Sequence, residues 1–360
     1  MAVMPAASGQ RSQSLQPIAS CAPGLSLLGI SDALDKATFE DAGVNGLSGL
    51  TYDRTTGKFI SVSDRQPRAF TLDIPLQGDP VITAAVELRD TDGTAYNGGT
   101  FDGEGIAITS SVEWLISSEL EPAIHRFAPD GTRLETFPTP EKFLIEPAGR
   151  GEANGAFESL ALAPGGRNLF TANERVLIGD DRDEDDRGRH RILRYRWDDA
   201  AGTFLPAEEY FYSTEPDQDI VEIAALTDSS LLVMERGLSF TEGFTARIFR
   251  VSLSGATNVS DIDRLADGTA QPLRKWLLAD ISDCIVGDGT TFGMNLNPIM
   301  DNFEAMALGP ELPGGNRALI VNSDDNFQDF QTTRFLILSV DNNKLVYHAH
   351  RSRYGGRLTQ

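Results

Sequence analysis

The chain has 360 residues, a formal net charge of −22 and a sequence pI near 4.5. This acidity argues against nucleic acid or an anionic membrane surface as a partner, because both would repel the chain. It favours cations as partners, or a secreted protein that its charge keeps soluble. Since no apolar run approaches the roughly 18 residues of a membrane-spanning helix, we expect no transmembrane segment.

The first twenty residues are small and polar and lack the apolar core of a signal peptide. We therefore interpret residues 1–23 as a flexible tail and residues 24–360 as one domain. Residues 18–21, IASC, resemble the end of a bacterial lipoprotein signal, which would make Cys21 a lipidation site. One pair of cysteines is no disulfide framework, so we expect Cys21 and Cys284 to be free thiols, with a disulfide between them as the alternative.

A four-strand unit recurs five times, and its last copy, NFEAMALGPELPGGNRALIVNSDDNF at residues 302–327, shows two of its strands joined by a Gly/Pro turn. The first strand recurs as GLSGLTY, DGEGIAI, AFESLAL and DIVEIAAL, which align Ser48, Glu104, Glu158, Glu222 and Glu304. The second strand ends in an acid each time, at Asp64, Glu119, Glu174, Glu235 and Asp324. A third and a looser fourth strand follow, the final fourth strand being KLVYHAH at residues 344–350.

Short strands separated by turns at regular spacing indicate an all-β sandwich, barrel or propeller. A four-stranded unit that keeps its internal order is typical of the blades of a β-propeller. We therefore predict an all-β fold, a β-propeller of five four-stranded blades. Residues 25–30 would pair with the last repeat and close the ring, which removes exposed sheet edges. If that strand starts a blade of its own, the ring has six blades.

If each first strand is innermost, its acid enters the central channel, and the second-strand acids approach the same end. Neighbouring carboxylates raise one another's pKa values, and a hard cation relieves their repulsion. Ca²⁺, which takes about six to eight oxygen ligands, is the expected ion, with Mg²⁺ or Mn²⁺ as alternatives. Zinc and copper are disfavoured because the chain has only four histidines and two cysteines to serve as their ligands. The expected metal ligands are Asp64, Glu104, Glu158, Glu304, Asp324 and Asp325.

Arginines follow three of the second-strand acids, as Arg65, Arg175 and Arg236. One interpretation is a structural ion pair with the neighbouring blade, and the other is a guanidinium fork for an anionic substrate such as a phosphate ester. No nucleophile motif accompanies them. The GLSGL sequence around Ser48 lacks the second glycine of a GxSxG elbow, and no histidine occupies the acidic positions of the repeat.

The motifs GLSGLTYD, ISVSDR, DGEGIAI, FESLALAPGGRNLFTANE, LVMERG, NFEAMALGP and VNSDDNFQ resemble the esterase-like phytase family over residues 46–340. The resemblance implies a propeller in an exported protein, periplasmic, extracellular or in an organelle lumen, with phosphoesterase or phytase-like activity. Carried over by motif, the acidic positions of the family fall on Asp64, Glu104, Glu119, Glu158, Glu174, Glu235, Glu304, Asp324 and Asp325, with Arg65 and Arg236 beside them.

Two functions remain open. The first is a calcium-dependent hydrolase of a phosphorylated small molecule or other ester, in which Arg65 and Arg236 orient the phosphate and Glu119 and Glu174 complete the catalytic set. The second is a non-enzymatic propeller that binds a partner, with an acidic and arginine ring that is structural. A serine esterase rests on the family's name alone. We expect a monomer in each case.

Overall fold

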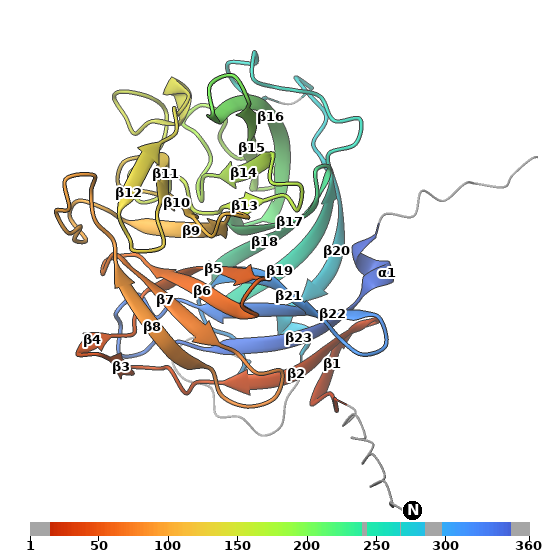
Figure 1. Ribbon diagram of the computed structural model, residues 1–360. Helices are drawn as coiled ribbons and strands as arrows, with labels where there is room; N and C mark the ends of the chain where they lie inside the picture. Colours follow the sequence, from red (N-terminus) through yellow and green to blue (C-terminus); the bar gives the residue numbers. More distant parts are fainter. Residues whose placement is uncertain (1–14, 240–242, 267, 285–296, 347–360) are drawn as a thin grey trace, which may run out of the picture.

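Five antiparallel sheets of four or five strands surround a central channel, as the blades of a five-bladed β-propeller (Figure 1). The computed structural model describes residues 15–239, 243–266, 268–284 and 297–346. The prediction of an all-β propeller is confirmed, and the number of blades is five rather than six.

The first four blades follow one another along the chain, each running from its inner to its outer strand. Blade 1 contains β5 (Leu47–Asp53), β6 (Lys58–Ser63), β7 (Arg68–Asp73) and β8 (Val81–Glu87). Blade 2 contains β9 (Gly103–Ile108), β10 (Trp114–Ser118), β11 (Ala123–Phe127) and β12 (Arg133–Thr136). Blade 3 contains β13 (Ala161–Leu162), β14 (Asn168–Ala172), β15 (Arg187–Asp198) and β16 (Thr203–Pro216). Blade 4 contains β17 (Asp219–Thr227), β18 (Ser230–Ser239), β19 (Gly243–Ser252) and β20 (Arg274–Asp280).

Blade 5 is built from both ends of the chain, with β21 (Phe303–Glu311), β22 (Asn316–Ser323) and β23 (Phe335–Asp341) on the inside and β2 (Leu25–Ser31) and β1 (Ala19–Ala22) on the outside. Figure 1 shows these first and last strands side by side. The predicted closure of the ring by residues 25–30 is thus confirmed, and β1 extends the blade into the stretch expected to be a tail. Short elements complete the described structure: β3 (Thr38–Phe39), β4 (Ala42–Gly43), η1 (Glu141–Phe143), η2 (Ile281–Asp283) and α1 (Asn342–Leu345).

The prediction of a last strand at residues 344–350 is wrong for its described part, residues 344–346, which belong to α1 and the bend after it. The outer edge of β23 pairs with β2, so an N-terminal strand occupies the place in blade 5 where the C-terminal strand was expected. Instead, the side chain of Asp341 caps α1 by accepting a hydrogen bond from the Asn343 backbone N–H (2.9 Å). Residues 347–350 of that predicted strand lie outside the described residues.

The apolar core lies between the blades, because each blade packs one face on the next. The inner strands β5, β9, β13, β17 and β21 contact one another in turn around the channel. Gly49 and Gly105 make this close approach feasible. A Cβ on Gly49 would lie 2.2 Å from the carbonyl oxygen of Glu104, and a Cβ on Gly105 would lie 2.4 Å from the backbone nitrogen of Leu160.

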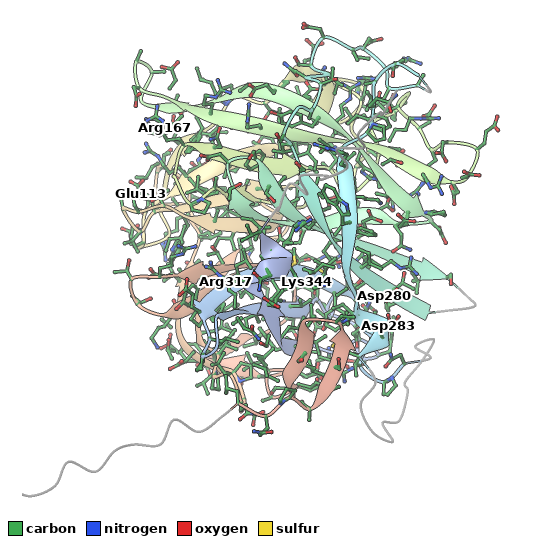
Figure 2. All side chains as sticks on the ribbon, turned by 90° about the vertical axis from the view of Figure 1, so that its right-hand side faces the viewer. Glu113, Arg167, Asp280, Asp283, Arg317 and Lys344 are labelled. Carbon is green, nitrogen blue, oxygen red and sulfur yellow. A yellow bond between two sulfur atoms is a disulfide. The ribbon has the colours of Figure 1, made fainter. Side chains whose placement is uncertain are left out.

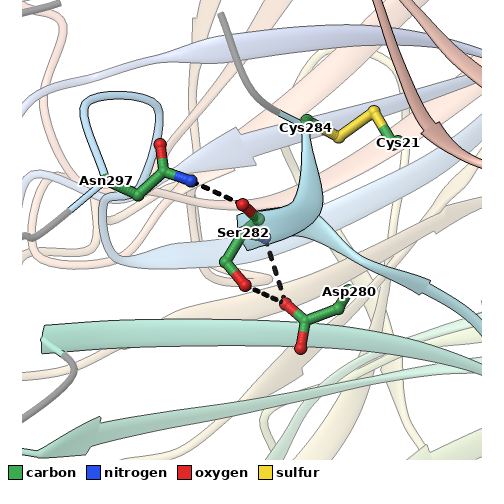
Figure 3. Close-up of a disulfide and its surroundings, with 5 residues drawn as sticks. All are labelled: Cys21, Asp280, Ser282, Cys284 and Asn297. Carbon is green, nitrogen blue, oxygen red and sulfur yellow. Dashed lines mark hydrogen bonds between the residues drawn. A yellow bond between two sulfur atoms is a disulfide. The ribbon is translucent and has the colours of Figure 1, made fainter.

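Cys21 and Cys284 form a disulfide that joins β1 to the end of η2, so the expectation of free thiols is wrong (Figure 3). The residues are 263 apart in sequence, and only the closed ring brings blade 5 beside the end of blade 4. Asp280 caps η2 by accepting from the Ser282 N–H (3.1 Å). The disulfide also occupies the sulfur of Cys21, which a lipid thioether at this residue would require.

Charged side chains lie around the outside of the ring, as at Arg167, which pairs with Asp199 (2.7 Å) (Figure 2). Among the helices that the structure describes, none has the length and apolarity required to cross a membrane.

Candidate functional site

A β-bulge interrupts the pairing of the first two strands at the same place in every blade, near one end of the channel. The register shifts beside Ser48, Glu104, Glu158, Val221 and Glu304. A bulge adds one unpaired residue and changes the direction of its side chain. The residue of the second strand or its extension that lies beside the start of the first strand is, in blade order, Asp64, Glu119, Glu174, Arg236 and Asp324.

In the first two strands of blade 4, the residues equivalent to those of the other blades lie one position away from where the sequence repeat places them. Ile220 pairs with Glu235 as Phe303 pairs with Ser323, so Glu235 matches a serine of blade 5 rather than an acid. Val221 and Arg236 therefore occupy the positions that were expected to hold Glu222 and Glu235. A shift of one residue turns a strand side chain to the other face, which removes both glutamates from the channel end.

The two displaced glutamates have structural partners. Oε1 of Glu222 accepts a hydrogen bond from the backbone N–H of Leu160 (3.3 Å), which links blade 4 to blade 3. Glu235 accepts from the hydroxyl of Tyr212 (2.5 Å) and pairs with Nζ of Lys275 (2.7 Å). Neither Glu222 nor Glu235 therefore stands with the other acids of the repeat at this end of the channel, contrary to the expectation.

The other acidic positions line a cavity of about 440 Å³ at this end of the channel. Its lining includes the carboxyl groups of Asp64, Asp102, Glu104, Glu119, Glu158, Glu174, Asp217, Asp219, Glu304 and Asp324 and the guanidinium groups of Arg65, Arg175 and Arg236. Histidine and cysteine are absent from this lining, as far as the described residues extend. The structure thus brings together five of the six predicted metal ligands and all four predicted catalytic residues.

The sixth predicted ligand, Asp325, lies outside the cavity lining. Its Oδ2 is 2.5 Å from Nζ of Lys36, and its Oδ1 accepts from the backbone N–H of Gly46 (3.0 Å). Both oxygens therefore hold the segment before blade 1 against blade 5. Sequence reasoning missed Asp102, which lines the cavity in its place. Its spacing from Glu104, in the pattern D-x-E, was the signal that could have identified it.

Two groups of three carboxylates lie within the cavity, and we call them triad A and triad B. Triad A consists of Asp64, Asp102 and Glu104, from the inner part of blades 1 and 2. Triad B consists of Glu119, Glu158 and Glu174, from blades 2 and 3. In each triad, one oxygen per residue lies within 4.8 Å of the other two, which is close enough for a single cation to bridge them.

Burial and mutual repulsion raise the pKa values of these carboxyl groups. Glu104 and Glu158 are each 7% exposed, and burial, followed by the charges of neighbouring acids, raises the pKa of each well above its usual value. Burial and the charge of Glu174 raise the pKa of Glu119 to about 7. Burial also raises the pKa of Asp64 to about 7, with Asp102 adding to the shift. The cavity therefore favours protons or cations.

Arg236 is the buried counter-charge of the cavity. Its Nη2 lies 2.5 Å from Oε1 of Glu174, and its Nη1 donates to Glu304 and Asn302. Burial alone would lower the pKa of Arg236, but Glu304 and Glu174 raise it above its usual value. Of the two interpretations of the arginines, the interblade ion pair applies to Arg236.

Arg65 and Arg175 lie at the rim of the same cavity, and their side chains are 53% and 50% exposed. Nε of Arg65 is 3.5 Å from Asp64, and Nη1 of Arg175 is 3.4 Å from Glu152. These long, solvated contacts leave both guanidinium groups able to reorient toward a ligand.

No match was found among the curated proteins. The family model described as phytase-like, esterase-like activity of phytase, matches residues 42–327. The matched residues include blades 1 to 4 and the strands β21 and β22 of blade 5, and with them all ten carboxyl groups of the cavity. On this match over most of its length, the chain belongs to the phytase-like family.

Proposed function

We propose that this protein hydrolyses phosphate esters in the acidic cavity with the help of a hard divalent cation, calcium in the first place. The observation that carries the proposal is the placement of triads A and B in one cavity. Membership of a family described by an esterase-like activity supports a hydrolase. A volume of about 440 Å³ is in the range of small-molecule sites.

The donor set fits a hard cation. Glu104 lines the cavity at 7% exposure and accepts no hydrogen bond from a described residue. Oδ1 of Asp64 and Oδ1 of Asp102 are also buried without a hydrogen-bond partner among the described residues. A buried carboxylate without a partner is costly, and an ion with oxygen ligands removes that cost. Ligand separations up to 4.8 Å suit Ca²⁺, whose oxygen ligands lie at about 2.3–2.6 Å. Mg²⁺ or Mn²⁺ remain the alternatives.

The roles of the side chains follow from their surroundings. Arg65 and Arg175 are the guanidinium groups free to orient a phosphate at the rim, whereas Arg236 already pairs with two glutamates. Glu119, with a pKa near 7, is suited to accept a proton from the attacking water at neutral pH. A bound divalent cation supplies charge neutralisation at the phosphate and a lower pKa for water.

The disulfide supports a location in an oxidising compartment, because such bonds persist mainly outside the cytosol. We propose on this basis that the protein acts outside the cytosol. A second candidate function, a non-enzymatic binding propeller, is favoured by the ion pairs of Arg236, which have the character of a structural link between blades.

The test compares the metal-free protein with the same protein after addition of Ca²⁺. Thermal unfolding measures binding, and release of p-nitrophenol from p-nitrophenyl phosphate and from its bis ester measures hydrolysis. We expect Ca²⁺ to raise the melting temperature and to restore hydrolysis. Glu104→Gln should abolish the activity, whereas Glu113→Gln, in the same blade but outside the cavity, should not.

Two outcomes contradict the proposal. Full hydrolysis after complete removal of divalent metal would exclude the metal-dependent mechanism. A rise in melting temperature with Ca²⁺ but no hydrolysis of either ester would leave a binding propeller with a structural cation.

A further inference from the structure

We propose that the cavity takes one divalent cation rather than two, in triad A, and that Arg236 serves as the fixed positive charge for triad B. This inference rests on the proposed function only in that it assumes a cation enters the cavity. The ligands are then Asp64, Asp102 and Glu104, one ion binds per chain, and the fixed positive charge of Arg236 lies on the side of triad B.

Triad A has the half-exposed Arg65 as its counter-charge and contains no buried one among the described residues. Glu104 is 7% exposed, lines the cavity and accepts no hydrogen bond from the part of the chain that the structure describes. Oδ1 of Asp64 and Oδ1 of Asp102 are buried, and neither has a hydrogen-bond partner among the described residues. The ion pair between Asp64 and Arg65 spans 3.5 Å, and its arginine is half exposed, so water screens it. Triad A is therefore the place where a cation relieves most repulsion.

Triad B already has donors on two of its three members. Oε1 of Glu174 lies 2.5 Å from Nη2 of Arg236, and Oε1 of Glu119 accepts a hydrogen bond from the backbone N–H of Ala156 (3.0 Å). Glu158 alone accepts none from a described residue. A divalent ion entering triad B would meet the guanidinium charge at close range, and that repulsion is strong in a poorly solvated cavity.

The register of blade 4 explains this asymmetry. Arg236 stands at the ring position that holds a carboxylate in the other four blades. Blade 4 has blades 3 and 5 as neighbours, so Arg236 reaches Glu174 and Glu304, while blades 1 and 2 are the two that do not adjoin it. Triad A lies in those two blades. A phosphate bound to a cation in triad A would thus face the positive charge of Arg236 across the cavity.

The experiment titrates Ca²⁺ alone into the metal-free full-length protein by isothermal calorimetry. We expect one ion per chain. Asp102→Asn should weaken binding at least about tenfold, because it replaces a charged carboxylate ligand by a neutral amide. Glu158→Gln, the matched change in triad B, should leave the affinity within about twofold. Arg236→Gln should raise the stoichiometry from one ion to two, because it frees Glu174 and Glu304.

Several outcomes would overturn the inference: two ions in the unaltered protein, equal losses from Asp102→Asn and Glu158→Gln, or no binding of Ca²⁺ at all. Circular dichroism establishes that each variant is folded. If Arg236→Gln fails to fold, the comparison of Asp102→Asn with Glu158→Gln still tests which triad binds the ion. The ester assay separates this inference from the proposed function. One ion bound in triad A without hydrolysis leaves the inference standing and contradicts the hydrolase.

Discussion

Arg236 and Glu174 join blade 4 to blade 3 through an ion pair of 2.5 Å between Nη2 and Oε1. The same guanidinium pairs with Glu304 of blade 5, so one side chain links three of the five blades. Both glutamate side chains are less than one-fifth exposed. Loss of the arginine would leave buried carboxylates facing one another without a counter-charge.

We therefore expect Arg236→Met to lower the free energy of unfolding by about 3 kcal/mol or more at neutral pH in the absence of metal. Urea unfolding measures the change. Arg175→Met is the matched control, because its guanidinium is half exposed and its contact with Glu152 is 3.4 Å, and it should cost less than about 1 kcal/mol. Equal losses in the two variants would contradict the central role of Arg236.

The disulfide holds β1 to the end of blade 4, beside the place where the N-terminal strands close the ring. We expect the double change Cys21→Ser with Cys284→Ser to lower the free energy of unfolding by about 2–5 kcal/mol, because the cross-link restricts the unfolded chain. Unfolding with and without a reductant measures this. The reductant should destabilise the unaltered protein and leave the double variant unchanged. No effect of reductant on either protein would show that the ring closes as firmly without the bond.

The stability of the metal-free protein should depend on pH through the cavity acids. Burial and the charge of Glu174 raise the pKa of Glu119 from 4.5 to about 7 in the folded state, so the folded protein binds this proton more tightly than the unfolded chain. The resulting stabilisation is fully present below about pH 4.5 and is lost as the pH rises through about 7. Burial acts on Asp64 in the same direction.

Melting temperatures measured in EDTA from pH 4.5 to 8 should therefore fall as the pH rises. Glu119→Gln mimics the protonated acid and should flatten this slope, whereas Glu113→Gln in the same blade should keep it. Added Ca²⁺ should weaken the decline, because a cation replaces the protons. A melting temperature that rises with pH in EDTA would contradict the assignment of these raised pKa values.

Gly105 should be intolerant of a side chain. A Cβ at this position would lie 2.4 Å from the backbone nitrogen of Leu160 in the neighbouring inner strand, and backbone cannot move aside as a flexible side chain can. We expect Gly105→Ala to destabilise the protein by about 1–3 kcal/mol. Gly165→Ala is the control, because the nearest atom there lies at an ordinary 3.7 Å, and its effect should stay within about 0.5 kcal/mol. Thermal or urea unfolding of both variants gives the comparison.

Local patterns in the sequence were sufficient to predict a propeller, although they left five or six blades open. Strand length, turn residues and the order of strands within each repeat are properties of short segments, so the five copies predicted five blades without knowledge of long-range contacts. The same reasoning predicted closure by residues 25–30, because a ring of blades must pair its two ends. The acids Asp64, Glu104, Glu158, Glu304 and Asp324 were likewise found from their repeated positions, and all of them line the cavity.

The tertiary structure decided what depends on register and on distance in space. A bulge moves a strand by one residue, and the similarity of DIVEIAAL to NFEAMAL could not reveal that Val221, not Glu222, stands at the shift. Contacts between residues far apart in the chain decide which acids share a triad. Such contacts also pair Asp325 with Lys36 and Cys21 with Cys284. By itself, the sequence determined a propeller of five repeats with an acidic channel end, and the pairing of β2 with β23 then decided for five blades over six. Only the packing of the closed ring decided that Arg236 faces Glu174 and Glu304, because neighbouring blades set the partners of each buried charge.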